Sequence, residues 1–319
     1  MRRHWFGSMG AALAATLARP AWWAMALAAF LVRGGVLLIL LPILSLPTTA
    51  GLTTAVAPAL ESLILGRQSL QGVLAGAVLI TLVLAAVTAA LLAGSWLDLA
   101  LVREAAEDED VDLRWTPVHG SVREALALRV TAHLPTVLAL GYAVLRLVPV
   151  AYEELTAPGE TTAPVVTRVL ERAPDAVAIV VIAWLAGEAI GSLAARRSAA
   201  GMAATPAIIA SARQLLGPRG LATLALTSAV LVVLWLPFLL ATQRAWAHLR
   251  ADLLDGADAV QLGAALVLLS ATWVLGLAVA GAGLAWRATA WTAEVALPAA
   301  VDQPVASSPP EVAPGAVGG

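Results

Sequence analysis

The sequence contains no cysteine and no lysine. Without cysteine the chain forms no disulfide, has no thiol nucleophile and offers no thiolate to a metal ion. All 19 basic residues are arginines, and 21 acidic residues nearly balance them, which leaves a formal net charge of −2. A charge balance of this kind gives no indication of nucleic-acid binding. We therefore predict no nucleic-acid partner.

Short motifs with a known chemical mechanism are also missing. The sequence has no P-loop, no GxGxxG fingerprint, no GxSxG nucleophile elbow and no HExxH pair. Its four histidines form no recognisable metal-binding pattern. We therefore predict no cofactor and no metal site, and we expect the protein not to be an enzyme.

Long apolar runs dominate what is present. Hydrophobic residues make up 60% of the chain and charged residues 13%, and the mean hydropathy is +0.87. Runs of about 18 or more apolar residues indicate membrane-spanning helices. The sequence predicts an all-α, polytopic membrane helix bundle with six transmembrane helices. The predicted spans are residues 21–46, 72–102, 134–151, 176–195, 221–242 and 260–286.

The remaining segments suggest how the chain is organised around these spans. Residues 1–20 are predicted to be an N-terminal interfacial helix, residues 21–295 the six-span membrane domain, and residues 296–319 a disordered tail rich in Pro, Ala and Gly. With the N-terminus inside, twelve arginines fall in cytoplasmic segments and five in outer segments. Cytoplasmic loops carry the excess of basic residues. We therefore predict a multi-pass protein of a bacterial inner membrane with both termini cytoplasmic.

A short helical segment ending near a proline occurs three times, each time before a predicted span. The segments are Ser8–Pro20, Ser121–Pro135 and Thr205–Pro218. In the second and third segments apolar residues alternate with arginine, which is typical of helices that lie in the membrane interface with arginine toward the headgroups. The alternative is that these prolines are ordinary helix breakers in loops. Six tryptophans near predicted cytoplasmic boundaries, Trp286 and Trp291 among them, fit an interfacial aromatic belt. The pattern predicts three repeats of an interfacial helix followed by a pair of spans.

Charged residues inside predicted spans are the candidate functional residues. Arg33 lies about 18 Å along its span, near the middle of the bilayer, where a charge costs at least about 2.5–3.5 kcal/mol. Glu188 converges with it in depth, so we predict an Arg33–Glu188 pair in the bundle interior. Asp98 is a shallower, secondary candidate. Arg146 is a further polar candidate, interpreted as an interface anchor near Glu153 and Glu154.

Small residues beside Glu188 support its placement inside the bundle. Ala183, Gly187, Gly191 and Ala195 recur every four residues, which allows another helix to approach closely. The pair has three readings. It can fix helix register, Arg33 can instead extend to the membrane surface, or the two residues can serve in transport or proton relay.

The segments LARPAWWAMALAAFLVRGG and LLGPRGLATLALTSAVL resemble a broad group of bacterial six-helix membrane proteins. That group is similar to the membrane domain found beside some glycerophosphodiester phosphodiesterases, and the resemblance covers about residues 8–295. No catalytic domain accompanies it here. We expect the lipid bilayer as a partner, with a membrane protein or a second copy of the chain as further partners. The expected role is a non-enzymatic scaffold, assembly factor or partner subunit. The alternative is a small secondary transporter or lipid-handling protein that uses Arg33 and Glu188 in a polar cavity.

Overall fold

The structure, a computed structural model, describes residues 5–40, 43, 70–107, 120–156 and 164–302 of the chain. Within these ranges it contains helices and no strand, so the predicted all-α fold class is confirmed. The elements are α1 (Trp5–Ala18), α2 (Pro20–Phe30), the π-helical turn η1 (Leu31–Gly35), α3 (Val36–Leu40), α5 (Leu70–Glu107), α6 (Val122–Ala132), α7 (Leu134–Thr156), α8 (Val165–Arg172), α9 (Pro174–Ala199), α10 (Ala204–Leu216), α11 (Pro218–Leu254) and α12 (Ala259–Asp302).

Five long helices match the last five predicted spans. The segments long and apolar enough to cross a membrane are Gly72–Ala106, Leu134–Glu154, Pro174–Ala199, Pro218–Leu254 and Ala259–Val295. A sixth candidate is the bent pair Trp5–Ala18 and Pro20–Gly35, whose axes meet at 97°. The chain therefore has five or six candidate spans, which supports a multi-pass membrane protein.

The first predicted span, residues 21–46, differs from expectation because its helix is interrupted. Arg33 and Gly34 leave helical geometry, and Gly34 has φ 101°, a left-handed conformation that glycine adopts without steric cost. The helix resumes as α3 and is described only to Leu40. Of the six residues that follow in the predicted span, 41–42 and 44–46 lie outside the described residues.

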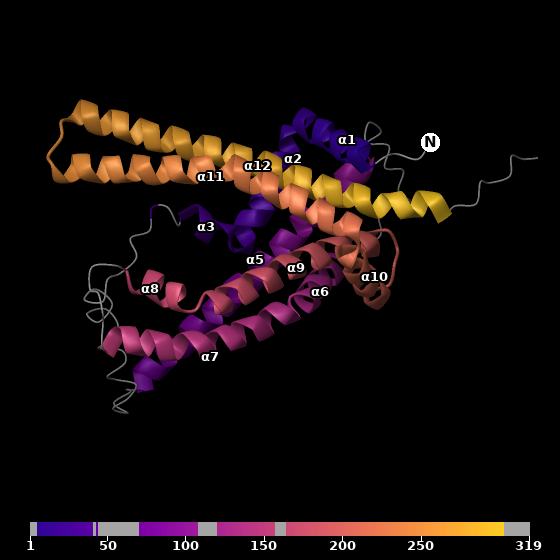
Figure 1. Ribbon diagram of the computed structural model, residues 1–319, viewed down its shortest axis with the longest axis horizontal. Helices are drawn as coiled ribbons and strands as arrows, with labels where there is room; N and C mark the ends of the chain where they lie inside the picture. Colours follow the sequence, from indigo (N-terminus) through magenta and orange to yellow (C-terminus); the bar gives the residue numbers. More distant parts are fainter. Residues whose placement is uncertain (1–4, 41–42, 44–69, 108–119, 157–163, 303–319) are drawn as a thin grey trace, which may run out of the picture.

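Short helices precede the predicted first, third and fifth spans, in the order that the sequence pattern predicts. α1, α6 and α10 lie toward the same end of the bundle, where α12 also ends, and they are followed by α2, α7 and α11 (Figure 1). Ser121 caps α6 by accepting a hydrogen bond from the backbone N–H of Glu124 at 3.2 Å. Pro20 and Pro218 occupy the first position of α2 and α11, where the missing N–H costs nothing.

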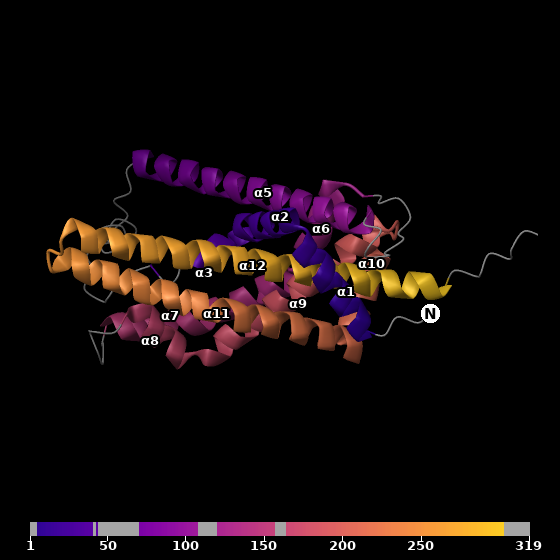
Figure 2. The same ribbon diagram turned by 90° about the horizontal axis from the view of Figure 1, so that it is seen from above.

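Helix α9 lies at the centre of the bundle. It packs against α5, α6, α7, α8, α10 and α12. α11 and α12 form a long antiparallel pair on one side, and α5 lies on another side in the view from above (Figure 2). The long helices expose many large apolar side chains, Val78, Leu79 and Leu82 of α5 among them, as expected for helices that face lipid tails.

Two details of the sequence interpretation need correction. α12 continues to Asp302, so residues 296–302 of the predicted disordered tail are helical, and the rest of the tail lies outside the described residues.

The six tryptophans near the predicted cytoplasmic boundaries do not all form an interfacial belt. Trp22, Trp286 and Trp291 have exposed fractions of 1%, 6% and 1% and pack inside the protein. Burial of such large aromatic surfaces stabilises the helix packing at this end of the bundle.

Candidate functional site: an arginine-rich cavity in the bundle

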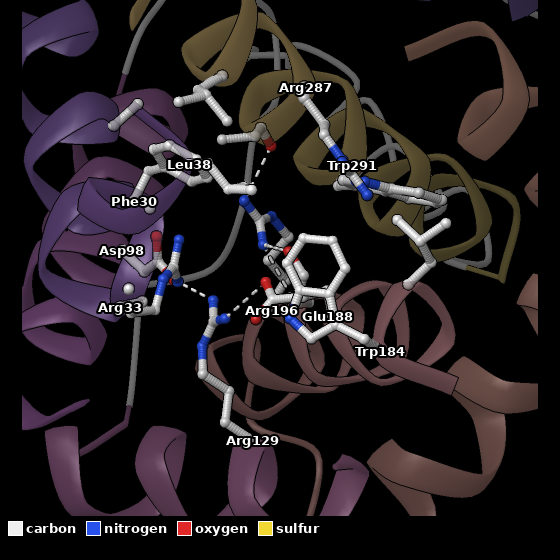
Figure 3. Close-up of a pocket in the computed structure, with 17 residues that line it drawn as sticks. Phe30, Arg33, Leu38, Asp98, Arg129, Trp184, Glu188, Arg196, Arg287 and Trp291 are labelled. Carbon is white, nitrogen blue, oxygen red and sulfur yellow. Dashed lines mark hydrogen bonds and ion pairs between the residues drawn. The ribbon is translucent and has the colours of Figure 1, made fainter. Parts of the chain in front are cut away.

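A cavity of about 430 Å³ lies between η1, α5, α6, α9 and α12 (Figure 3). Its size falls in the usual range for small-molecule sites. Four arginines and two carboxylates supply the charged part of its lining: Arg33, Arg129, Arg196, Arg287, Asp98 and Glu188. The cavity therefore brings both residues of the predicted pair, and the secondary candidate Asp98, to one place. We call it the arginine cavity.

Arg33 reaches the cavity because the helix breaks at its own position. Its stem lies over Gly94 of α5, where a Cβ would come within 2.8 Å of the Arg33 Cγ. Its Nη1 donates to the Oδ2 of Asp98, which lies four residues further along α5. The predicted direct pair of Arg33 with Glu188 is therefore wrong. Asp98, one helical turn from the glycine that admits the arginine, is the closer carboxylate.

Arg129 connects the two carboxylates. Its Nη2 donates to Asp98, and its Nη1 donates to the Oε2 of Glu188 at 3.2 Å. Arg129 is 5% exposed, so the expectation that α6 directs its arginines toward headgroups is wrong for this residue. Burial lowers the pKa of its guanidinium, but the two carboxylates outweigh that effect and raise the pKa.

The sequence contains a signal that identifies Arg129. The buried positions of α6 are Ala125, Leu128, Arg129 and Ala132. They follow the i, i+3, i+4, i+7 spacing of one helix face. Arg129 thus lies on the apolar stripe of its helix, whereas Arg123 lies on the exposed side.

His133 completes the partners of Glu188. Its Nε2 lies 3.3 Å from the Glu188 Oε1, and its Nδ1 lies 2.9 Å from the backbone carbonyl oxygen of Arg129. A carbonyl and a carboxylate both accept hydrogen bonds, so both ring nitrogens are best satisfied when both carry a proton. The hydrogen bond to Glu188 raises the pKa of His133 above its ordinary value, against the effect of partial burial.

The other two arginines of the cavity have no carboxylate partner among the described residues. Arg196 is 2% exposed and donates to the hydroxyl of Thr292 at 2.9 Å, to the carbonyl and hydroxyl of Ser192 at 2.9 and 2.5 Å, and to the carbonyl of Ala288 at 2.9 Å. Arg287 has no hydrogen bond or ion pair within that part of the chain. Every carboxylate of the cavity already contacts two cationic or ionisable side chains. The cavity therefore carries two positive charges that its own acids do not neutralise.

Aromatic and aliphatic side chains line the rest of the arginine cavity. Trp291 is 1% exposed, and its indole Nε1–H lacks a hydrogen-bond acceptor among the described residues. Leu38 and Trp184 also line the cavity and are exposed, at 42% and 39%. Because these two side chains are exposed, they mark an opening of the cavity at the surface of the bundle.

The glycines of the predicted small-residue stripe lie where α6 approaches α9. A Cβ at Gly187 would come within 3.1 Å of the Ala132 carbonyl oxygen, and a Cβ at Gly191 within 3.3 Å of the Arg129 Cγ. This close approach lets Arg129 reach Glu188. Ala183 and Ala195, the outer members of the stripe, are partly buried.

Arg146 lies outside the cavity, toward the opposite end of the bundle. Its Nε is 3.3 Å from the Asp175 Oδ2, which also accepts a hydrogen bond from the Tyr142 hydroxyl at 2.8 Å. The expected neighbours Glu153 and Glu154 pair instead with arginines of α8.

Comparison with known proteins found no match: no family model, no curated protein and no solved structure is similar to this chain. The resemblance to six-helix membrane domains therefore stays a prediction. The described residues contain no group of histidine and acidic side chains arranged to hold a metal ion. The chemistry of the site consequently rests on the guanidinium groups and the aromatic lining of the cavity.

Proposed function

We propose that this chain is a lipid-handling membrane protein that holds the headgroup of an anionic lipid in the arginine cavity. The observation that carries the proposal is the cavity itself, with four arginines against two carboxylates inside a bundle of membrane-spanning helices. Cations that are enclosed in a cavity without a carboxylate partner are costly, which makes them candidates for binding an anion. An anionic group bound beside them would offset that cost and would accept hydrogen bonds from Arg287 and from the remaining N–H of Arg196.

The polarity of the cavity fits an amphiphile with one defined orientation. Trp184 precedes Arg196 by twelve residues on α9, which is about 18 Å along the helix. Trp184 and Leu38 mark the apolar opening, whereas Arg196 lies near the end of the bundle that holds α1, α6 and α10. A lipid from the leaflet at that end would place its headgroup among the arginines and its chains toward the middle of the bilayer.

We further propose that this leaflet is the cytoplasmic one of a bacterial inner membrane, with both chain termini on that side. The excess of arginine at this end supports the orientation. Since the chain has no cysteine, single-cysteine variants test it cleanly. Met202→Cys, in the turn between α9 and α10, should react with an impermeant maleimide only after the cells are opened, and Leu254→Cys, at the far end of α11, should react in intact cells. The reverse pattern would invert the orientation.

A binding measurement tests the main proposal. The detergent-purified protein is titrated with phosphatidylglycerol, phosphatidic acid or phosphatidylcholine, and thermal unfolding is recorded. A ligand present at 100 times its Kd stabilises the folded state by about 2.7 kcal/mol. The anionic lipids should raise Tm by several degrees, and the zwitterionic lipid should not.

A pair of variants locates the binding. Ser192→Phe places a ring inside the cavity and should abolish the rise in Tm. Val274→Phe adds the same ring to a lipid-facing position of α12 that is 64% exposed, and it should keep the rise. Equal responses of the two variants, or no response of the unchanged protein to any anionic lipid, would contradict the proposal. The latter result would favour the scaffold or partner-subunit role.

A further inference from the structure

The positive charges of the arginine cavity fall into two groups with different partners. Arg33 and Arg129 bind the carboxylates of Asp98 and Glu188, so this group is neutral when His133 is uncharged. Arg196 and Arg287 have no acid of their own among the described residues. The uncompensated charge therefore belongs to Arg196 of α9 and Arg287 of α12, on the side of the cavity where these two helices meet, which we call the α12 wall.

The α12 wall consists of one face of α12 together with the Arg196 side chain of α9. Leu284, Arg287, Ala288 and Trp291 line the cavity at i, i+3, i+4 and i+7 spacing, which is one face of the helix. Arg196 is anchored on the same helix through the Ala288 carbonyl at 2.9 Å and the Thr292 hydroxyl at 2.9 Å. Its guanidinium is thereby fixed within one turn of both Arg287 and Trp291. Arg196, Arg287 and Trp291 thus line the same side of the cavity (Figure 3).

Resting on the proposed function, we infer that this region is a subsite for a phosphomonoester, the terminal phosphate of a lipid such as phosphatidic acid. A phosphomonoester carries a charge of about −1.5 to −2 at neutral pH and offers three strong acceptor oxygens. That charge matches the two uncompensated guanidinium groups, and the oxygens can accept hydrogen bonds from Arg287 and from the one N–H of Arg196 that its four bonds to Ser192, Ala288 and Thr292 leave over. A phosphodiester carries one negative charge and would leave one cation unmatched. The cavity volume of about 430 Å³ holds a compact headgroup, with the chains outside.

The chemistry alone also fits a soluble phosphate ester, but the opening past Leu38 and Trp184 faces apolar surroundings. A lipid would be stabilised both by the arginines and by the apolar opening, whereas a soluble ester would be stabilised by the arginines alone. The lipid source is therefore the one that the lining favours.

The test compares two lipids of equal chain length in nanodiscs at pH 7.5, each diluted into phosphatidylcholine. The unchanged protein should bind phosphatidic acid about 10-fold more tightly than phosphatidylglycerol. Arg287→Gln removes a charged hydrogen-bonding group and should weaken phosphatidic acid binding by about 10- to 100-fold, so that the two lipids bind almost equally. Arg287→Lys keeps the charge without the planar fork and should fall between. Arg123→Gln, which removes an exposed arginine of α6 at the same end of the bundle, should keep the preference.

Each contrary result has a separate meaning. Equal affinity of the unchanged protein for both anionic lipids would overturn the phosphomonoester subsite and leave the proposed function standing. Absence of binding to either lipid above the phosphatidylcholine background would overturn both. Glycerol phosphate, which has the headgroup without chains, should compete at least about 100-fold more weakly than phosphatidic acid. Competition at equal concentration would show that a soluble ester is the ligand and would overturn the assignment to a lipid.

Discussion

The two charged regions near opposite ends of α9 differ in how their charges are matched. Near the end of α7 and the start of α9, Arg146 pairs with Asp175, Arg168 with Glu154, and Arg172 with Glu153 and Glu154, so each of these arginines has a carboxylate partner. In the arginine cavity, four arginines face two carboxylates. The first region has the composition of a structural ion-pair cluster, whereas the second is incomplete by itself. An excess of one charge sign around a cavity is the property that points to a ligand.

The largest effect is expected at Asp98. Asp98→Asn removes the carboxylate shared by Arg33 and Arg129 and leaves two enclosed cations without that partner. We expect the free energy of unfolding to fall by about 3 kcal/mol, measured by denaturant titration in detergent. The double variant with Arg33→Gln should recover part of the loss. Asp175→Asn in the matched region, where the partners are exposed, should leave Tm unchanged. Equal losses at both ends would remove the contrast between the regions.

The close approach of α6 to α9 is expected to give the next largest effect. Gly187→Leu forces side-chain atoms against the Ala132 carbonyl and should reduce stability by about 2 kcal/mol, because overpacking shifts a backbone that positions Arg129. Gly141→Leu on α7, where a Cβ would meet nothing within 4 Å, is the matched control and should be neutral or slightly stabilising. The readout is Tm of the purified variants. A neutral Gly187→Leu would show that the cavity does not depend on this helix contact.

Arg287 should give an effect of opposite sign in the lipid-free protein. Arg287→Met removes an uncompensated cation from a partly buried position and keeps a flexible apolar side chain. We expect it to raise the free energy of unfolding in lipid-free detergent by about 1 kcal/mol, since residues kept for binding often reduce stability. Arg172→Met in the matched region leaves Glu153 and Glu154 without this partner and should show no gain. A loss of stability at Arg287 in the absence of lipid would mean that its charge is already balanced.

The smallest effect is expected from the titration of His133. Its folded-state pKa is raised, so its contribution to stability is complete at pH values below the ordinary value of about 6.5 and is lost as pH rises through the raised pKa. The unchanged protein should be more stable than His133→Gln by about 1 kcal/mol at pH 6. This advantage should shrink as pH rises. Tm recorded for both proteins across this range tests the prediction, and a constant difference would contradict the titration.

The sequence predicts the helix bundle but does not predict which charged residues pair inside it. Long apolar runs predict spanning helices because hydrocarbon requires every backbone hydrogen bond to be made within the segment. They do not show by themselves that the first span breaks at Arg33; the local signal for the break is the pair Gly34 and Gly35 that follows it. Depth alone favoured Glu188 as the partner of Arg33. The observed partner is set by lateral packing of α5 against η1, which a single sequence does not reveal.

The arginines of the cavity illustrate a second limit. Arg196 and Arg287 stand near span ends, where arginine usually marks the membrane boundary. This usual role does not predict that the two side chains line a cavity inside the bundle. The spacing of Glu188, Ser192 and Arg196 nevertheless places all three on one face of α9. A helical-face analysis of span ends would therefore have identified Arg196, just as it identifies Arg129 on α6.

The position of the Arg33 guanidinium depends on two glycines, each of which has a hydrogen atom where other residues carry a side chain. Gly34 adopts φ 101°, which an alanine would reach only at a cost of about 1–2 kcal/mol, and Gly94 leaves the space that the Arg33 stem fills. A methyl group at residue 34 would oppose the change in chain direction, and one at residue 94 would collide with the Arg33 stem. A chain with alanine at both positions would therefore have to hold the Arg33 guanidinium at a different place.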